Sequence, residues 1–146
     1  MDQAIQDFID SRNIAVVGAS RDNKKFGNIA YKELKARGYQ VYAVNPSTQS
    51  IEGDLSYPNL LSLEGKVDAV LVSVPANEGI QVIKDAAEIG ITKVWIQQQA
   101  DSPELLTVGQ QLGLNMVKGK CILMYAPPVR SFHGWHRAFV RVFGKL

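Results

Sequence analysis

Residues 14–20, IAVVGAS, join a short β-branched apolar run to a cluster of small residues. An apolar run of this length that ends at a glycine is typical of a buried strand in a parallel sheet. The small side chains of Gly18, Ala19 and Ser20 allow a ligand to approach the backbone closely. The stretch therefore predicts the first strand of an α/β sheet and the loop that leaves it.

Helix-like and strand-like segments alternate along the rest of the chain. Helical periodicity predicts helices over 4–9, 28–37, 77–90 and 102–112, and a short helical stretch at 60–63. Apolar runs predict further strands over 39–44, 67–74, 92–96, 114–117 and 121–124, with a loop over 47–60. This alternation predicts a single α/β domain: a Rossmann-like, doubly wound, mostly parallel sheet with the first strand central. We assign 1–125 to this domain.

Composition excludes several classes of protein. The chain has 146 residues, 46% of them hydrophobic, and a net charge of +2, which fits one folded domain and argues against disorder. The central part has no basic cluster with interleaved aromatic residues, so we expect no nucleic-acid partner. Residues 1–10 do not resemble a signal peptide, no apolar run reaches membrane-spanning length, and Cys121 is the single cysteine. We expect a cytoplasmic protein without a metal site.

Residues 18–28 are suited to binding an anion. Helix N-termini attract anions through their free N–H groups and their dipole, and Arg21, Lys24 and Lys25 add positive charge just before the predicted helix. Ser20 and Asn23 stand where a dinucleotide fingerprint would have its second and third glycines, and no Gly-Lys-Ser/Thr follows as in a P-loop. An ordinary turn with solvated lysines remains the alternative.

The end of the second predicted strand bears on the choice of nucleotide. The segment Val44-Asn45-Pro46 carries no carboxylate of the kind that holds the ribose hydroxyls of NAD, and no arginine for the phosphate of NADP. The hydroxyls of Ser47 and Thr48 are suited to a ribose phosphate, which coenzyme A carries. An ordinary Asn-Pro turn is the competing interpretation.

Five short motifs occur in order over about residues 10–125: VVGAS at 16–20, VNP at 44–46 followed by IEG at 51–53, VP at 74–75, WIQ at 95–97, and Cys121. Together they resemble the small stand-alone CoA-binding proteins, which are similar to the N-terminal CoA-binding domain of the succinyl-CoA synthetase alpha subunit. Two features depart from that family: Gln98-Gln99-Ala100 replaces a common glycine, and Lys118-Gly119-Lys120 precedes the cysteine.

The resemblance implies where each part of coenzyme A would lie. Its phosphates would lie over Gly18–Lys25, its adenine end near Val44–Thr48, and its pantetheine arm past Pro75 toward Ile96–Gln98. The expected cofactor-binding residues are Gly18, Ala19, Ser20, Arg21, Lys24, Lys25, Val44, Asn45, Pro46, Thr48, Val74, Pro75, Ile96, Gln97 and Gln98. The ligase's phosphorylated histidine belongs to a second domain, so ligase activity is not implied.

No residues form a recognisable catalytic motif. Ser20 is not in a G-x-S-x-G sequence, and the two histidines, His133 and His136, lie far from it. These histidines alone are a weak metal site. A lone cysteine such as Cys121 is more often a core residue than a nucleophile or a partner in a mixed disulfide with CoA.

Residues 126–146 alternate apolar and basic side chains behind Pro127-Pro128. The pattern predicts an amphipathic basic C-terminal helix, which we expect to pack in a homo-oligomer rather than on a membrane surface.

The sequence thus favours a non-catalytic protein that binds CoA or an acyl-CoA at the carboxyl edge of the sheet as a carrier, sensor or regulator. An NAD(P)-binding oxidoreductase or redox sensor on the same fold is the alternative, and a scaffold without a ligand is a third hypothesis.

Overall fold

A seven-stranded sheet forms the centre of the computed structural model, which describes residues 2–128. Its spatial order is β3-β4-β2-β1-β5-β6-β7, and every neighbouring pair is parallel except β3 and β4. The strands are β1 (Asn13–Val17), β2 (Gln40–Val44), β3 (Ser50–Ile51), β4 (Asp54–Tyr57), β5 (Ala69–Val72), β6 (Lys93–Gln97) and β7 (Asn115–Lys120). The predicted α/β fold with a mostly parallel sheet and β1 near its centre is confirmed.

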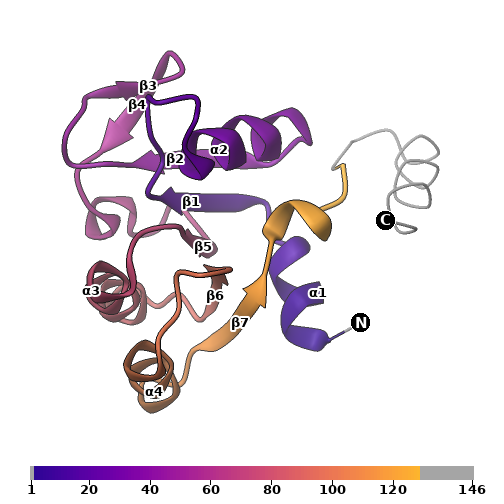
Figure 1. The fold of residues 1–146 in the computed structure, drawn as a ribbon, viewed down its shortest axis with the longest axis vertical. Helices are drawn as coiled ribbons and strands as arrows, with labels where there is room; N and C mark the ends of the chain where they lie inside the picture. The colour runs from indigo at the N-terminus through magenta and orange to yellow at the C-terminus, as the bar shows by residue number, and fades with distance from the viewer. Residues whose placement is uncertain (1, 129–146) are drawn as a thin grey trace.

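Helices cover both faces of the sheet (Figure 1). They are α1 (Gln3–Ile9), α2 (Phe26–Ala36), α3 (Ala76–Glu88) and α4 (Pro103–Gln111), with short 3-10 helices η1 (Leu60–Leu63) and η2 (Ile122–Met124). Alternate residues of β1 serve the two faces: Ile14 and Val16 pack with α1 and α2, whereas Ala15 and Val17 pack with η1, α3 and α4. The molecule is therefore a doubly wound sandwich with a buried sheet.

The helix boundaries follow local signals in the sequence. Ser102 begins α4, because its Oγ accepts a hydrogen bond from the Leu105 N–H at 3.1 Å, and Pro103 occupies the first helical position. Gly38 and Gly90 follow the ends of α2 and α3 with φ values of +103° and +85°.

Two predicted segments differ from the structure. The sequence predicts a strand over 121–124, but Ile122–Met124 forms η2. Gln97 Oε1 accepts a hydrogen bond from the Ile122 N–H at 3.1 Å. This bond holds the fully buried Ile122 side chain in the core that includes α1 and α2. The expected loop over 47–60 contains the hairpin of β3 and β4. Because β3 has two residues and β4 has four, this short hairpin carries too little apolar alternation to be recognised.

Other expectations concern the C-terminal end of the chain. The predicted amphipathic C-terminal helix lies outside the described residues from residue 129 onward. The homo-oligomer contact expected of it, His133 and His136 lie outside them too. Within residues 2–128, no helix has the length and apolar character needed to cross a membrane.

Candidate functional site

A cavity of about 550 Å³ opens where β1, β2 and β5 reach their carboxyl ends. β1 lies between β2 and β5, so the chain leaves the sheet in different directions on its two sides. Ligands of doubly wound folds bind in the crevice that this arrangement creates. The position of the cavity therefore makes it the candidate binding site.

Two glycines allow the loop of residues 18–25, which we call the β1–α2 loop, to pack tightly. Gly18 has a φ of +101°, and a Cβ there would lie 2.2 Å from the carbonyl oxygen of Ser73. A Cβ on Gly27 would lie 1.8 Å from the Gly18 carbonyl oxygen. Any larger residue at either position would push the loop away from β5 or from the start of α2.

Two asparagines hold successive carbonyls of this loop. Asn45 Nδ2 donates to the Ala19 carbonyl at 2.9 Å, and Asn28 Nδ2 donates to the Ser20 carbonyl at 2.8 Å. A trans peptide group directs its C=O and its N–H in opposite directions. The N–H groups of Ser20 and Arg21 therefore point away from the asparagines, and neither has a partner among the described residues.

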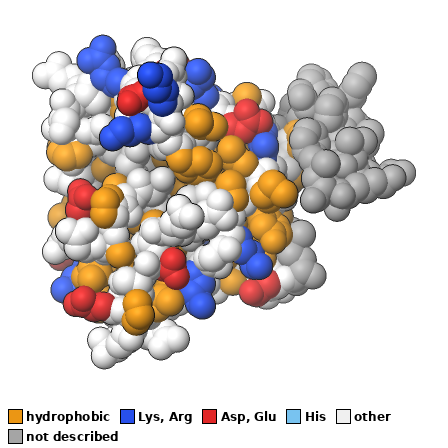
Figure 2. Space-filling model, viewed as in Figure 1, with side chains coloured by type: hydrophobic (Ala, Val, Ile, Leu, Met, Phe, Trp, Pro, Cys, Tyr) orange, Lys and Arg blue, Asp and Glu red, His pale blue; other side chains and the backbone are white. Residues whose placement is uncertain are grey.

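The first turn of α2 continues this set of donors. Lys25 is the N-cap, its side chain makes no capping hydrogen bond, and the N–H groups of Phe26 and Gly27 have no partner in the described part of the chain. Successive free N–H groups at a helix N-terminus form a site for an anion. Lys25 also lines the cavity, and the exposed Arg21 and Lys24 lie on the same loop. Basic side chains gather at the top of the molecule, over α2 and the loop before it (Figure 2).

The opposite wall of the cavity differs in charge. α3 contributes Glu78, Gln81 and Asp85, and Gln81 Nε2 donates to Asp85 Oδ1 at 2.9 Å. The cavity is also lined by apolar side chains, among them Val17, Val44, Leu60, Val74 and Val82. The cavity thus offers N–H donors and cations on one side and carboxylates on the other, so a bound anion is expected at the β1–α2 loop.

Most of the predicted binding residues meet in this cavity. Those lining it are Gly18, Ala19, Ser20, Lys25, Val44, Asn45, Pro46, Val74 and Pro75. The Thr48 hydroxyl, outside the lining, donates to the Ser50 carbonyl at 3.0 Å and so stabilises its own turn.

The predicted residues at the end of β6 lie apart from the cavity lining. The side chains of Ile96 and Gln97 are buried, and Gln97 has the structural role described above at Ile122. Gln98 is exposed, and Cys121 is half-buried just after β7.

The sequence did not identify several residues that shape the site. Gly27 lies nine positions after Gly18, beyond the usual glycine motif, although a glycine in the first turn of a helix was an available signal. Asn28 is 1% exposed and connects the loop to Glu52, whose carboxylate Oε2 lies 2.8 Å from Asn28 Nδ2. The α3 residues that line the cavity are those on the face of the helix that is turned toward it, and they form no recognisable sequence motif.

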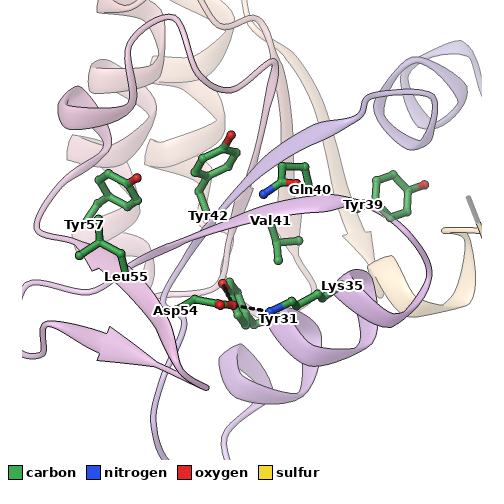
Figure 3. Close-up of a pocket in the computed structure, with 9 residues that line it drawn as sticks. All are labelled: Tyr31, Lys35, Tyr39, Gln40, Val41, Tyr42, Asp54, Leu55 and Tyr57. Atoms are coloured by element: carbon green, nitrogen blue, oxygen red, sulfur yellow. Dashed lines mark hydrogen bonds and ion pairs between the residues drawn. The ribbon is translucent and has the colours of Figure 1, made fainter.

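A smaller cavity of about 220 Å³ lies where β2 and β4 diverge (Figure 3). Asp54 accepts hydrogen bonds there from Lys35 Nζ at 2.6 Å and from the Tyr31 hydroxyl at 2.8 Å. The hydrogen bond from Lys35, and next the one from Tyr31, lowers the pKa of Asp54. Burial, and next the hydrogen bond to Asp54, raises the pKa of Tyr31. These contacts attach the β3–β4 hairpin to α2.

The larger cavity presents few titratable side chains. No group of three or more potential metal ligands occurs within residues 2–128. The titratable side chains that line the larger cavity are Lys25, Glu78 and Asp85.

Comparison with known proteins identifies relatives of the chain. A family model described as a CoA binding domain matches residues 12–127. Over 126 residues the chain is 29% identical to the alpha subunit of ADP-forming acetate–CoA ligase II from Pyrococcus furiosus, a match that covers 79% of this chain and 28% of that subunit. The chain spans less than a third of the length of this subunit and of three further ADP-forming acetate–CoA ligases that it matches.

Solved structures of similar size share the fold. A conserved hypothetical protein from Pyrococcus furiosus is 39% identical with a TM-score of 0.74, covering 77% of this chain and 97% of that one. A hypothetical protein from Pyrococcus horikoshii is 29% identical with a TM-score of 0.77, covering 84% of this chain and 87% of that one. The resemblance drawn from the short motifs is confirmed.

Proposed function

Because this chain belongs to the CoA-binding domain family, we propose that its larger cavity binds coenzyme A or an acyl-CoA. In this proposal the protein is a carrier, a sensor or a regulatory partner of an enzyme that uses acyl-CoA, without catalysis of its own. Its relationship to part of an ADP-forming acetate–CoA ligase subunit supports a role in acyl-CoA metabolism.

One observation carries the proposal: the β1–α2 loop lines a largely apolar cavity, and unpartnered N–H groups occur in this loop and in the first turn of α2 that follows it. A pyrophosphate needs several N–H donors and positive charge, whereas adenine and pantetheine need apolar walls with a few polar groups. The volume of about 550 Å³ lies within the range of about 300–1,000 Å³ that is typical of small-molecule sites.

The residues fit the parts of the cofactor as follows. The backbone of Gly18–Arg21 and the side chains of Lys24 and Lys25 hold the phosphates. Val44–Thr48 is assigned to the adenine end, and Val74 and Pro75 guide the pantetheine arm toward Ile96–Gln98. The carboxylates of Glu78 and Asp85 disfavour phosphate on the opposite wall.

The test is isothermal titration of the purified protein with CoA, NAD, NADP and ATP under identical conditions. We expect preferential binding of CoA, weakened about tenfold in the double variant Lys24→Ala/Lys25→Ala, because two exposed charge contacts contribute about 0.5–1 kcal/mol each. The matched control is Lys66→Ala/Lys93→Ala, which removes the same charge at the amino ends of β5 and β6.

The alternatives predict different titrations. Preferential binding of NAD or NADP would favour the oxidoreductase or redox-sensor hypothesis. Heat from none of the four ligands would contradict the proposal and favour a scaffold. Equal loss in both lysine double variants would contradict the assignment of the phosphates to the β1–α2 loop.

A further inference from the structure

Glu52 occupies a backbone conformation that does not suit glutamate. It has a φ of +52°, and Gly53, which follows it, has a φ of +81°. These two residues form the turn between β3 and β4, and positive φ at both positions is the pattern of a type I′ turn. Asparagine, aspartate or glycine is favoured at the first position, so a glutamate there calls for a reason outside the turn.

The carboxylate of Glu52 supplies that reason. Its Oε2 accepts a hydrogen bond from Asn28 Nδ2 at 2.8 Å, and the same nitrogen donates to the Ser20 carbonyl at 2.8 Å. Asn28 is the third residue of α2 and is 1% exposed. One buried amide group therefore connects the turn of the β3–β4 hairpin to the β1–α2 loop.

The other atom of this amide shows that its orientation is fixed. Asn28 Oδ1 is buried and has no hydrogen-bond partner, which is a costly state for an acceptor. Reversing the amide would place this oxygen against the oxygens of both Ser20 and Glu52. The two donated bonds therefore determine the orientation, and Glu52 makes it the favoured one.

We propose that Glu52 is a positioning residue for the phosphates of the bound cofactor. It orients the Asn28 amide, which holds the Ser20 carbonyl and so presents the N–H of Arg21, in the same peptide group, to the anion. This inference rests on the proposed binding of CoA, and it assigns to the β3–β4 hairpin a part in shaping a site that it does not line.

Asp54 provides a matched control on the same hairpin. It too accepts hydrogen bonds from α2, but from Tyr31 and Lys35, at the smaller cavity (Figure 3). Removing either carboxylate loosens the contact between hairpin and helix. Only the loss of Glu52 releases the amide that holds the β1–α2 loop.

The experiment compares the variants Glu52→Ala, Glu52→Gln and Asp54→Ala with the unmodified protein. Titration with CoA and with ADP, a probe that keeps the adenosine and pyrophosphate of CoA but lacks its 3′-phosphate and pantetheine arm, gives the affinities. Amide NMR follows the N–H resonances of Ser20 and Arg21. Urea unfolding measures the stability of each variant.

We expect Glu52→Ala to weaken CoA and ADP to a similar extent, by about tenfold, the effect of one charge-assisted hydrogen bond. The Arg21 resonance should shift in this variant even without ligand. Glu52→Gln should bind within about threefold of the unmodified protein, because its amide oxygen still accepts from Asn28. Asp54→Ala should leave both affinities within about twofold, whatever its stability.

Each other outcome decides a separate point. Equal losses in Glu52→Ala and Asp54→Ala would reduce Glu52 to a structural residue, and an unchanged affinity in Glu52→Ala would also overturn the inference. If the unmodified protein bound neither CoA nor ADP, the proposed function itself would fail.

Discussion

Gly27 shows how much can depend on the absence of one side chain. Its backbone is of ordinary helical form, so conformational freedom does not require glycine there. The requirement is steric, since the Gly18 carbonyl occupies the place of a Cβ. The start of α2 can therefore lie directly against the β1–α2 loop.

At this scale we expect Gly27→Ala to lower the free energy of unfolding by about 3 kcal/mol or more, because backbone atoms must move to admit the methyl group. Gly65→Ala is the control: its φ is +79° and nothing lies within 4 Å of the added Cβ, so only backbone strain of about 1–2 kcal/mol applies. Urea denaturation measures both variants. A smaller loss at Gly27 than at Gly65 would contradict the close packing.

The sequence identified those site residues whose signals are local. Gly18–Ser20 and Asn45 directly follow apolar strands, Pro75 comes three residues after one, and parallel strands bring their carboxyl ends to one edge of a sheet. Asn28 and Glu52 could not be found in this way. They are 24 positions apart, and they meet only because β4 pairs with β2 and thereby places the hairpin turn beside α2.

Among the elements, the strands and helices with strong periodicity were predicted well and the weak ones were not. β5 is apolar at every position because it is buried on both faces, so its continuous apolar run identifies it without any alternation of apolar and polar residues. The β3–β4 hairpin instead depends on side chains of α2 for its position. The segment at Ile122–Met124 has strand-like composition, but contact with Gln97 bends it into η2.

Tyr39, the residue just before β2, connects this strand to α1. Its hydroxyl donates at 2.6 Å to the carbonyl of Ile9, the last residue of α1. Burial raises the pKa of Tyr39 above its ordinary value of 10.0. In the unfolded chain the phenol ionises near that value, whereas in the folded protein it stays protonated. Its contribution to stability is therefore complete below about pH 10 and is lost as the pH rises toward the folded pKa.

We expect Tyr39→Phe to cost about 1 kcal/mol at pH 7, from the lost hydrogen bond, and to reduce the fall in stability between about pH 9 and pH 11. Tyr42→Phe is a control, since that ring is only half-buried. Urea midpoints across this range measure the effect. A pH dependence unchanged by Tyr39→Phe would show that this phenol ionises equally in both states.

For the molecule as a whole, the strand order determines which parts of the fold a bound ligand would stabilise. The cavity is formed by segments that follow β1, β2 and β5, together with α3, so a ligand bound there would contact parts of both halves of the sheet. A ligand that binds only the folded form stabilises it by about 2.7 kcal/mol at a hundredfold excess over its Kd.

We therefore expect CoA at that concentration to raise the thermal midpoint by roughly 5–10 °C for a domain of this size. Scanning calorimetry with and without CoA measures the shift. Lys24→Ala/Lys25→Ala should show a smaller shift at the same CoA concentration, since its Kd is larger. An identical shift in both proteins would place the stabilising contact elsewhere.

The positive φ of Glu52 has a consequence for engineering and for divergence. Asparagine or glycine at position 52 would relax the turn, and this gain in stability opposes the loss of the contact between the hairpin and α2. The same replacement would remove the acceptor that orients Asn28. Under the proposed role of Glu52, the turn and the cofactor site therefore favour different amino acids at the same position.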